Sequence, residues 1–455
     1  MARRIRERGW FGNGAAGVRG GGVGAVRRAA AVALAGVLLA AGPAAAQMKL
    51  LSADEAVKVA LERNPGARQA AEELQAASGQ AMAARSAVLP QFGVGARYNN
   101  TIRESIGYSS SGVRFGTEFW SGAASFDQTL VSFPAWAQIR AASGAQDAAA
   151  AGNQAARADV ALLAYRQYYA LLKAYKFKRV TTLSLQLRQD QLTRTQALFD
   201  LGSVARGDVL KQKVTVSQAQ QEDIAAGKNI IVQSALLAGI LGLDIGTTVD
   251  IDTALTEVAI DVDSAAVVKD ALERRPELAE YRARLASARA NLGGAQGGRY
   301  PSLTGNLSYS FQTAGFPEDW QTIDENARWS ANLSLNLPVF DGLFAKGRIR
   351  EAGARQLQAE YELQRQELII VVEVEQALQT ALQARDQIRV ARDGFNAAEE
   401  DLKLTQEKYN VGSATVIELI DSQLSLTAAA VDLINALADA HVAQMQLKRA
   451  RGEKF

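Results

Sequence analysis

Cysteine is absent from the 455 residues of the chain. Its absence excludes disulfide bonds, zinc sites built on thiolates, a cysteine nucleophile and a lipid-modified N-terminal cysteine. Histidine occurs once, as His441, and is expected to be an ordinary helix-surface residue because no second histidine or cysteine exists to share a metal. No grouping of nucleophile, base and orienting residue is visible. The sequence therefore predicts a protein that is not an enzyme and uses no cofactor.

An excess of charge of one sign is also lacking. The chain has 50 basic and 48 acidic residues, which leave a net charge of +2. These residues are spread along the chain, and the local runs of like charge are typical of solvated helix faces. Nothing in the distribution indicates a nucleic-acid partner.

A long hydrophobic run is missing after residue 46. Residues 1–46 have the features of a signal peptide: scattered arginines, an apolar run over 29–41, and small residues ending in Ala44-Ala45-Ala46. A single membrane anchor is the alternative interpretation of this segment. No later stretch approaches the ~18 consecutive apolar residues of a membrane helix. An exported chain of this kind is either soluble or a β-barrel, since closed barrels satisfy their backbone groups in lipid.

An internal repeat organises the rest of the chain, with equivalent residues separated by about 210 positions. The matched pairs are Phe199 and Tyr409, Gly202 and Gly412, Ser203 and Ser413, Asp208 and Glu418, and Pro90 and Pro301. The sequence therefore predicts a first repeat over 47–246, a linker over 247–263 and a second repeat over 264–455. Each repeat is expected to contain a helix, two strands, a long helix and a further helix.

The strands of the second repeat show the clearest pattern. Apolar residues occupy every second position from Leu303 to Phe311 and again from Trp329 to Leu337, with polar residues between them. One apolar and one polar face are typical of a membrane barrel strand, with lipid outside and water inside. The long helices, of about 65 residues, would each extend ~100 Å, which no compact globular domain needs.

Four strands per chain are too few for a membrane barrel, whose lower limit is about eight. The barrel is therefore expected to be shared between chains. A trimer would supply twelve strands and close the sheet without leaving an edge. The paired shorter helices, stacked end to end, would match the long helix in length and prolong the lumen.

These features together resemble the TolC family of outer-membrane efflux proteins, the outer membrane factors. The resemblance covers residues 51 to about 452, and rests on the order of the repeats, the strand pairs opened by proline, the small-residue segments 137–141 and 347–351, and the aromatic-x-x-Gly turns. It implies an α+β membrane protein: a homotrimeric 12-stranded β-barrel, four strands per chain, continued by a long α-helical coiled-coil barrel in the periplasm of a Gram-negative bacterium.

The same resemblance implies a passive exit duct of a tripartite efflux or type I secretion system, in contact with outer-membrane lipid. The duct would be opened at its periplasmic tip by a periplasmic adaptor, or membrane fusion protein, and an inner-membrane RND or ABC transporter. Drugs, ions or proteins would be its cargo. The alternative from another class is a soluble periplasmic coiled-coil adaptor or structural protein, whose small β-domain would have a packed apolar interior.

The resemblance also assigns a periplasmic gate to the two turns. Glu418 and Asp421 lie three positions apart and so share one helix face. In TolC-like channels, acids at these places form rings around the closed aperture, and such rings select cations. Asp208 would bond Tyr409 and hold the neighbouring coil shut. Taken alone, Thr415-x-x-Glu418 is a capping box and favours the helix dipole.

One position departs from the pattern of the family. Some members carry an arginine that ties the coils together where this chain has Ala414. Either the lock is weaker in this chain, or Arg206 in the other turn takes over the role.

Overall fold

The computed structural model describes residues 51–100, 118–244, 246–247, 249–259, 264–313, 315–317 and 319–453. The expected signal peptide and parts of the expected linker lie outside these ranges. Residues Leu50–Phe455 form one compact unit.

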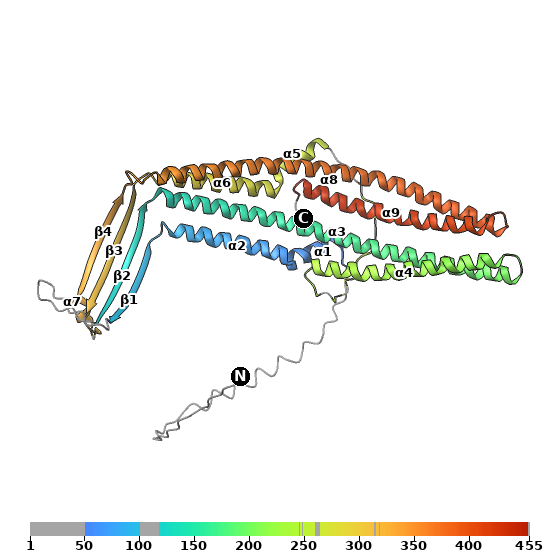
Figure 1. Cartoon of the computed structure of the whole chain (residues 1–455), viewed down its shortest axis with the longest axis horizontal. Helices are drawn as coiled ribbons and strands as arrows, with labels where there is room; N and C mark the ends of the chain where they lie inside the picture. Colours follow the sequence, from blue (N-terminus) through green and yellow to red (C-terminus); the bar gives the residue numbers. More distant parts are fainter. Residues whose placement is uncertain are drawn as a thin grey trace, which may run out of the picture. The chain divides into compact units, whose positions relative to one another are not determined.

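The order of elements repeats along this unit (Figure 1). The first half comprises α1 (Ala53–Arg63), α2 (Pro65–Ser86), β1 (Gln91–Asn100), β2 (Glu118–Val131), α3 (Phe133–Asp200) and α4 (Arg206–Ile240). The second half comprises α5 (Ser264–Arg274), α6 (Pro276–Gly297), β3 (Ser302–Thr313), α7 (Trp320–Glu325), β4 (Ala327–Asn336), α8 (Phe344–Asn410) and α9 (Val416–Ala450). The predicted internal repeat is confirmed, and the single turn of α7 has no described counterpart in the first half.

A proline divides the first helix of each half. Asn64 precedes Pro65 with φ −59° and ψ 128°, because the proline ring disfavours helical backbone in the residue before it. The freed helix start is then capped, since Asn64 Oδ1 accepts a hydrogen bond from the N–H of Gly66 at 2.8 Å. Arg275 has the same extended backbone before Pro276.

The four strands form one antiparallel sheet in the order β1-β2-β3-β4. The register places polar residues opposite one another, so that Asn306 lies between Asp127 and Asn332. Asn306 Nδ2 donates to Asp127 Oδ1 at 2.7 Å, and the hydroxyls of Ser308 and Ser330 are 2.7 Å apart. The polar face expected from the alternation is therefore continuous across the sheet.

The opposite face of the sheet is apolar, and the described part of this chain leaves much of it uncovered. Phe92 is 74% exposed and Trp329 is 71% exposed. Only local pairing occurs there, as between the rings of Tyr309 and Trp329, whose centroids are 5.0 Å apart. A soluble protein rarely exposes an apolar surface of this kind.

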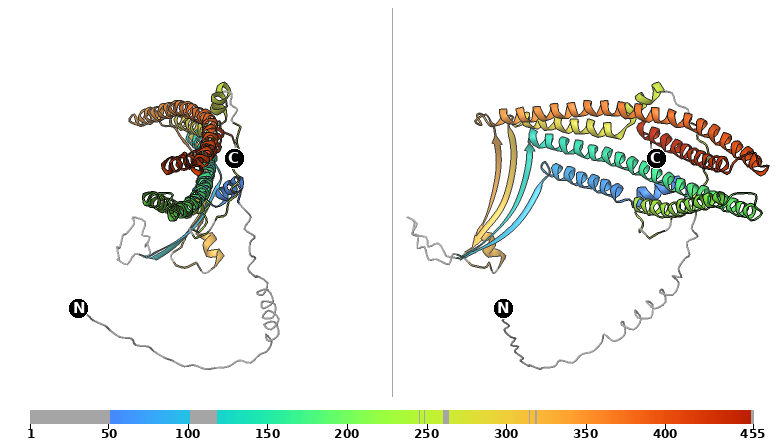
Figure 2. Two further views of the ribbon diagram at one scale, coloured as in Figure 1. Left: turned by 90° about the vertical axis from the view of Figure 1, so that its right-hand side faces the viewer. Right: turned by 45° about the vertical axis from the view of Figure 1, so that its right-hand side comes forward.

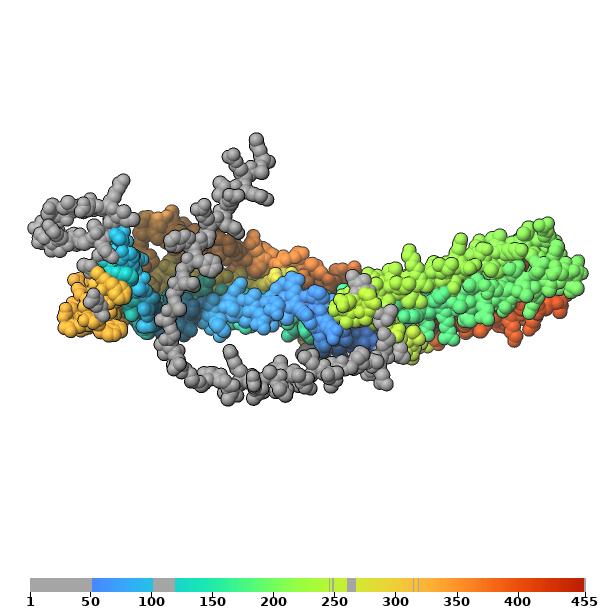
Figure 3. Space-filling view, turned by 90° about the horizontal axis from the view of Figure 1, so that it is seen from below, coloured from blue at the N-terminus to red at the C-terminus, as the bar shows by residue number. Residues whose placement is uncertain are grey.

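The helices of the unit lie along two long axes. α3 has 68 residues and α8 has 67, so each extends about 100 Å, as the sequence predicts. α1, α2 and α4 pack along α3, and α5 and α9 pack along α8. α6 packs against both long helices, chiefly α3, and α9 also contacts α3. Figure 3 shows α2 and α4 following one another on one face. Seen from the end remote from the sheet, the helices line a curved wall (Figure 2, left).

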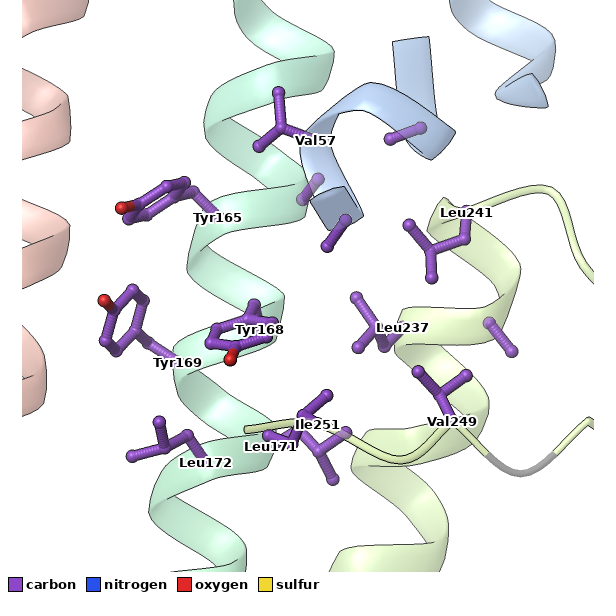
Figure 4. Packing of buried hydrophobic residues seen from close by; sticks show 14 of the residues in the cluster. Val57, Tyr165, Tyr168, Tyr169, Leu171, Leu172, Leu237, Leu241, Val249 and Ile251 are labelled. Atoms are coloured by element: carbon purple, nitrogen blue, oxygen red, sulfur yellow. The ribbon is translucent and has the colours of Figure 1, made fainter. Parts of the chain in front are cut away.

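A hydrophobic cluster holds the middle of this wall together (Figure 4). Leu171 of α3 and Leu237 of α4 are fully buried there, and Ile251 of the following segment packs against them. The hydroxyl of Tyr168 donates to the carbonyl of Asp252 at 2.9 Å. Burial, with the nearby charge of Asp252, raises the pKa of Tyr168 to about 12, so this donor keeps its proton at neutral pH.

One described helix, α9, has the length and composition of a membrane-crossing helix. The sequence reading did not single it out. Within the structure, Ala440 and Leu447 of α9 are buried in a cluster with Ile370 and Val374 of α8. Packing between the two helices therefore buries part of the apolar surface of α9.

The expectation that His441 is an ordinary surface residue is wrong. His441 is half-buried on α9, and its ring stacks on Tyr169 of α3 with a centroid distance of 4.7 Å. Nδ1 lies 3.0 Å from the Tyr169 hydroxyl, and Nε2 lies 2.8 Å from the carbonyl oxygen of Thr256. A neutral ring fits both bonds, with Nε2–H donating to the carbonyl and Nδ1 accepting from the hydroxyl.

This contact predicts a pH dependence of stability. Burial lowers the pKa of His441 below its usual 6.5, so protonation favours the unfolded chain. The stabilising contribution is present above pH 6.5 and is lost as the pH falls through the lowered pKa. Because the chain has one histidine, His441→Gln is expected to flatten the decline in melting temperature just below about pH 6.5. A decline of equal slope in the variant, measured by calorimetry, would contradict this assignment.

Candidate functional site

Two turns lie side by side at the end of the helices remote from the sheet (Figure 1). One joins α3 to α4 and the other joins α8 to α9. Both turns line a groove of about 520 Å³. Asp208 and Lys211 reach this groove from the first turn, and Tyr409 and Ala414 reach it from the second. Two of the residues that the sequence assigns to a gate therefore share one groove.

The two turns are built in the same way. Gly202 and Gly412 adopt left-handed backbone with φ of +75° and +77°, a conformation that glycine enters without a steric penalty. Each glycine N–H donates to the backbone carbonyl oxygen of the aromatic residue three positions earlier. The distance is 2.8 Å to Phe199 and 3.1 Å to Tyr409. The backbone N–H groups of the following serines donate to the carbonyl oxygens of Leu198 and Lys408, both at 2.9 Å. These paired bonds form the Schellman ending of a helix.

The backbone conformation at Gly412 yields a stability prediction. No atom lies within 4 Å of a Cβ added there, so the cost of Gly412→Ala comes from backbone strain alone, about 1–2 kcal/mol. The matched control is Gly227→Ala inside α4, where a Cβ also meets nothing and helix propensity favours alanine by about 1 kcal/mol. Denaturant unfolding is expected to move in opposite directions for the two variants. Equal shifts would exclude strain as the cause.

The beginnings of the next helices differ between the turns. At α9, Thr415 Oγ1 accepts from the Glu418 N–H, and Glu418 Oε2 accepts from the Thr415 N–H, both at 3.3 Å. The capping box is therefore present. At α4, Ala205 occupies the capping position and has no hydroxyl. Asp208, in the first turn of α4, lies 3.8 Å from Lys211 Nζ of the same helix.

Glu418 and Asp421 are exposed on α9, whereas the next residue after each of them, Leu419 and Ser422, is buried. Nothing described in this chain covers the two acids. They form a negative surface beside the end of the helical wall.

Asp208 and Tyr409 are both partly exposed in their shared groove. Within the described residues, no hydrogen bond joins the two side chains. Arg206, the first residue of α4, is exposed and does not line the groove. A bond between the two coils near the turns runs instead from Arg194 Nη1 of α3 to Asn410 Oδ1 of α8 at 3.2 Å. Local sequence patterns do not predict this pair, because 216 positions separate the two residues.

A two-faced sheet attached to a curved wall of ~100 Å helices defines the class of membrane channels with a long helical extension. The family model described as outer membrane efflux protein matches residues 56–243 and 267–453. The chain therefore belongs to the outer membrane efflux protein family.

Named relatives and a solved structure agree with this assignment. The outer membrane protein TolC of Escherichia coli is 24% identical over 408 residues, covering 86% of this chain and 80% of the relative. The pyoverdine export outer membrane protein OpmQ of Pseudomonas putida is 25% identical over 397 residues, covering 82% of this chain and 80% of the relative. The structure of the outer membrane protein VceC of Vibrio cholerae matches with a TM-score of 0.75 at 19% identity. The match covers 89% of this chain and 96% of VceC.

The predicted TolC-like fold, location and role as an exit duct are thereby confirmed. The protein belongs to the outer membrane of a Gram-negative bacterium, has a long periplasmic helical extension and serves in efflux with pump partners. The family is one of channel proteins. This assignment decides against the alternative of a soluble periplasmic adaptor.

Proposed function

We propose that three copies of this chain assemble into one duct. The observation that carries the proposal is the four-stranded sheet, whose strands β1 and β4 are unpaired on their outer sides within the described part of the chain. Three such sheets joined edge to edge give twelve strands, which exceeds the lower limit of about eight for a membrane barrel. The face with Phe92 and Trp329 then contacts lipid, and the face with Asn306 and Ser308 lines water.

The helical walls of the three copies would continue this lumen through the periplasm. We infer a passive duct that receives cargo from a periplasmic adaptor and an inner-membrane RND or ABC transporter. Relatives are named for pyoverdine export and for toluene efflux, which are different cargoes. A polar lumen fits a duct whose cargo is chosen by its pump.

The gate is proposed at the two turns. A threefold axis would bring three copies of Glu418 and Asp421 together, and rings of carboxylates select cations. Asp208 would bond Tyr409 across their shared groove and hold the coils together. Because Ala414 supplies no cation there, Arg206, which is exposed at the start of α4, is the candidate substitute.

Planar bilayers test the proposal as a whole. The purified protein is expected to form small, cation-selective channels that need no energy source, and to co-purify with its adaptor when both are expressed together. Failure to conduct, in the wild type and in variants of the gate alike, would contradict the duct. Capture with an ABC transporter rather than an RND pump would assign the chain to type I secretion.

A further inference from the structure

The half of α3 nearest the turns buries polar residues where a coiled coil normally buries apolar ones. The buried positions alternate in steps of three and four residues, which is the spacing of a helix seam. They are Thr181, Ser184, Arg188, Gln191 and Thr195. A seam of this composition loses packing energy, so each polar group in it requires a partner.

Among the residues of this seam, Arg188 most requires a partner, because it carries a charge. It is 2% exposed, and its one hydrogen bond is a long one of 3.4 Å from Nη1 to the carbonyl oxygen of Thr215 on α4. Nε and Nη2 have no partner, and no described carboxylate forms an ion pair with the guanidinium. A buried, uncompensated charge costs several kcal/mol.

Three glutamine side chains lie at about the same height along the helical wall as Arg188. Gln191 comes from α3, Gln212 from α4 and Gln423 from α9, and all three are buried. Gln212 Oε1 accepts from the hydroxyl of Thr215, the residue that Arg188 also contacts. One helical turn away, Thr427 of α9 bonds Ser184 of α3, which brings Gln423 level with Arg188.

The unpartnered atoms of this cluster are of one kind. Arg188 Nε and Nη2 and the Nε2 atoms of Gln191, Gln212 and Gln423 are all N–H donors. The cluster therefore has a positive charge and several free donors, and it lacks an acceptor with a negative charge. We propose that a single-atom anion of the size of chloride binds beside Arg188, between α3, α4 and α9.

The size and the position of the proposed anion follow from the packing of the side chains around Arg188. The side chains that form the cluster are buried within one chain, so a ligand among them has to be small, and a single-atom ion would displace less of this packing than a phosphate or carboxylate. The ion would neutralise Arg188 and join the α3–α4 coil to α9. This site requires neither the trimer nor the gate, and stands apart from the proposed function.

Bromide tests the site directly, because it replaces chloride and scatters anomalously. Crystals of the full protein grown in sodium bromide are expected to show an anomalous peak in direct contact with the Arg188 guanidinium nitrogens. Arg188→Met is expected to lose this peak. The proposal is overturned if ordered water, or glutamine oxygens turned toward Arg188, occupy the place instead.

A solution measurement gives an independent reading. At equal ionic strength, the wild type is expected to melt about 2–4 °C higher in chloride than in gluconate, since a ligand that binds only the folded state stabilises it. Arg188→Met should lose the difference, and the matched control Arg179→Met, on the exposed side of α3, should keep it. A difference that survives in Arg188→Met, or none in the wild type, would overturn the site.

Discussion

Replacing Glu418 with Gln and Asp421 with Asn together is expected to remove most of the cation selectivity of the channel. In the proposed trimer the two residues supply six carboxylates at the narrowest point, and their mutual field attracts cations and repels anions. Losing about 1.4 kcal/mol of differential stabilisation lowers the cation-to-anion permeability ratio about tenfold. The reversal potential in asymmetric potassium chloride measures this ratio.

The choice of amides keeps the helix start intact. Glutamine serves at the third position of a capping box as glutamate does, so Glu418→Gln preserves the bond to the Thr415 N–H. Asp432→Asn is the matched control, since Asp432 is an exposed acid farther along α9. An unchanged reversal potential in the double variant, with normal expression, would remove these acids from the constriction.

Asp208→Ala or Tyr409→Phe is expected to raise single-channel conductance several-fold. Both residues line the groove between the turns, and a hydrogen bond to a carboxylate contributes about 1.5–3 kcal/mol, enough to shift a closed-to-open equilibrium at least tenfold. Tyr409→Phe removes only the hydroxyl, so its effect isolates the bond. Single-channel recording in planar bilayers measures the result.

Two further variants sharpen this test of the gate. Asp200→Ala removes an exposed acid from the same end of α3 and should leave conductance unchanged. Ala414→Arg adds the cation that some relatives carry and should lower conductance, since it would strengthen the tie between the coils. If Asp208→Ala and Tyr409→Phe both conduct like the wild type, the lock does not lie between these residues.

Much of the fold is predictable from local patterns in the sequence. The period-two alternation in residues 303–311 and 329–337 fixes which face of each strand is apolar, and the register of the sheet preserves it. Gly202 and Gly412 mark the helix endings because left-handed backbone favours glycine. The constant spacing between repeats then extends each assignment from one half of the chain to the other.

Contacts between distant segments are not predictable in this way. No local pattern around His441 predicts its contact with Tyr169, because 272 positions separate the two residues. In the sequence, Arg188 does not differ from the other charged residues of its long helix. Its burial depends on the packing of α4 and α9 around it. The shared groove of Asp208 and Tyr409 likewise depends on how two coils lie together, which local periodicity does not specify.

The number of chains in the membrane particle tests the central claim most directly. Protein extracted from the outer-membrane fraction in mild detergent can be weighed by light scattering with the detergent contribution subtracted. The four-stranded sheet with two unpaired edges predicts three chains per particle. A monomer recovered from the soluble periplasmic fraction would contradict the shared barrel and the duct that depends on it.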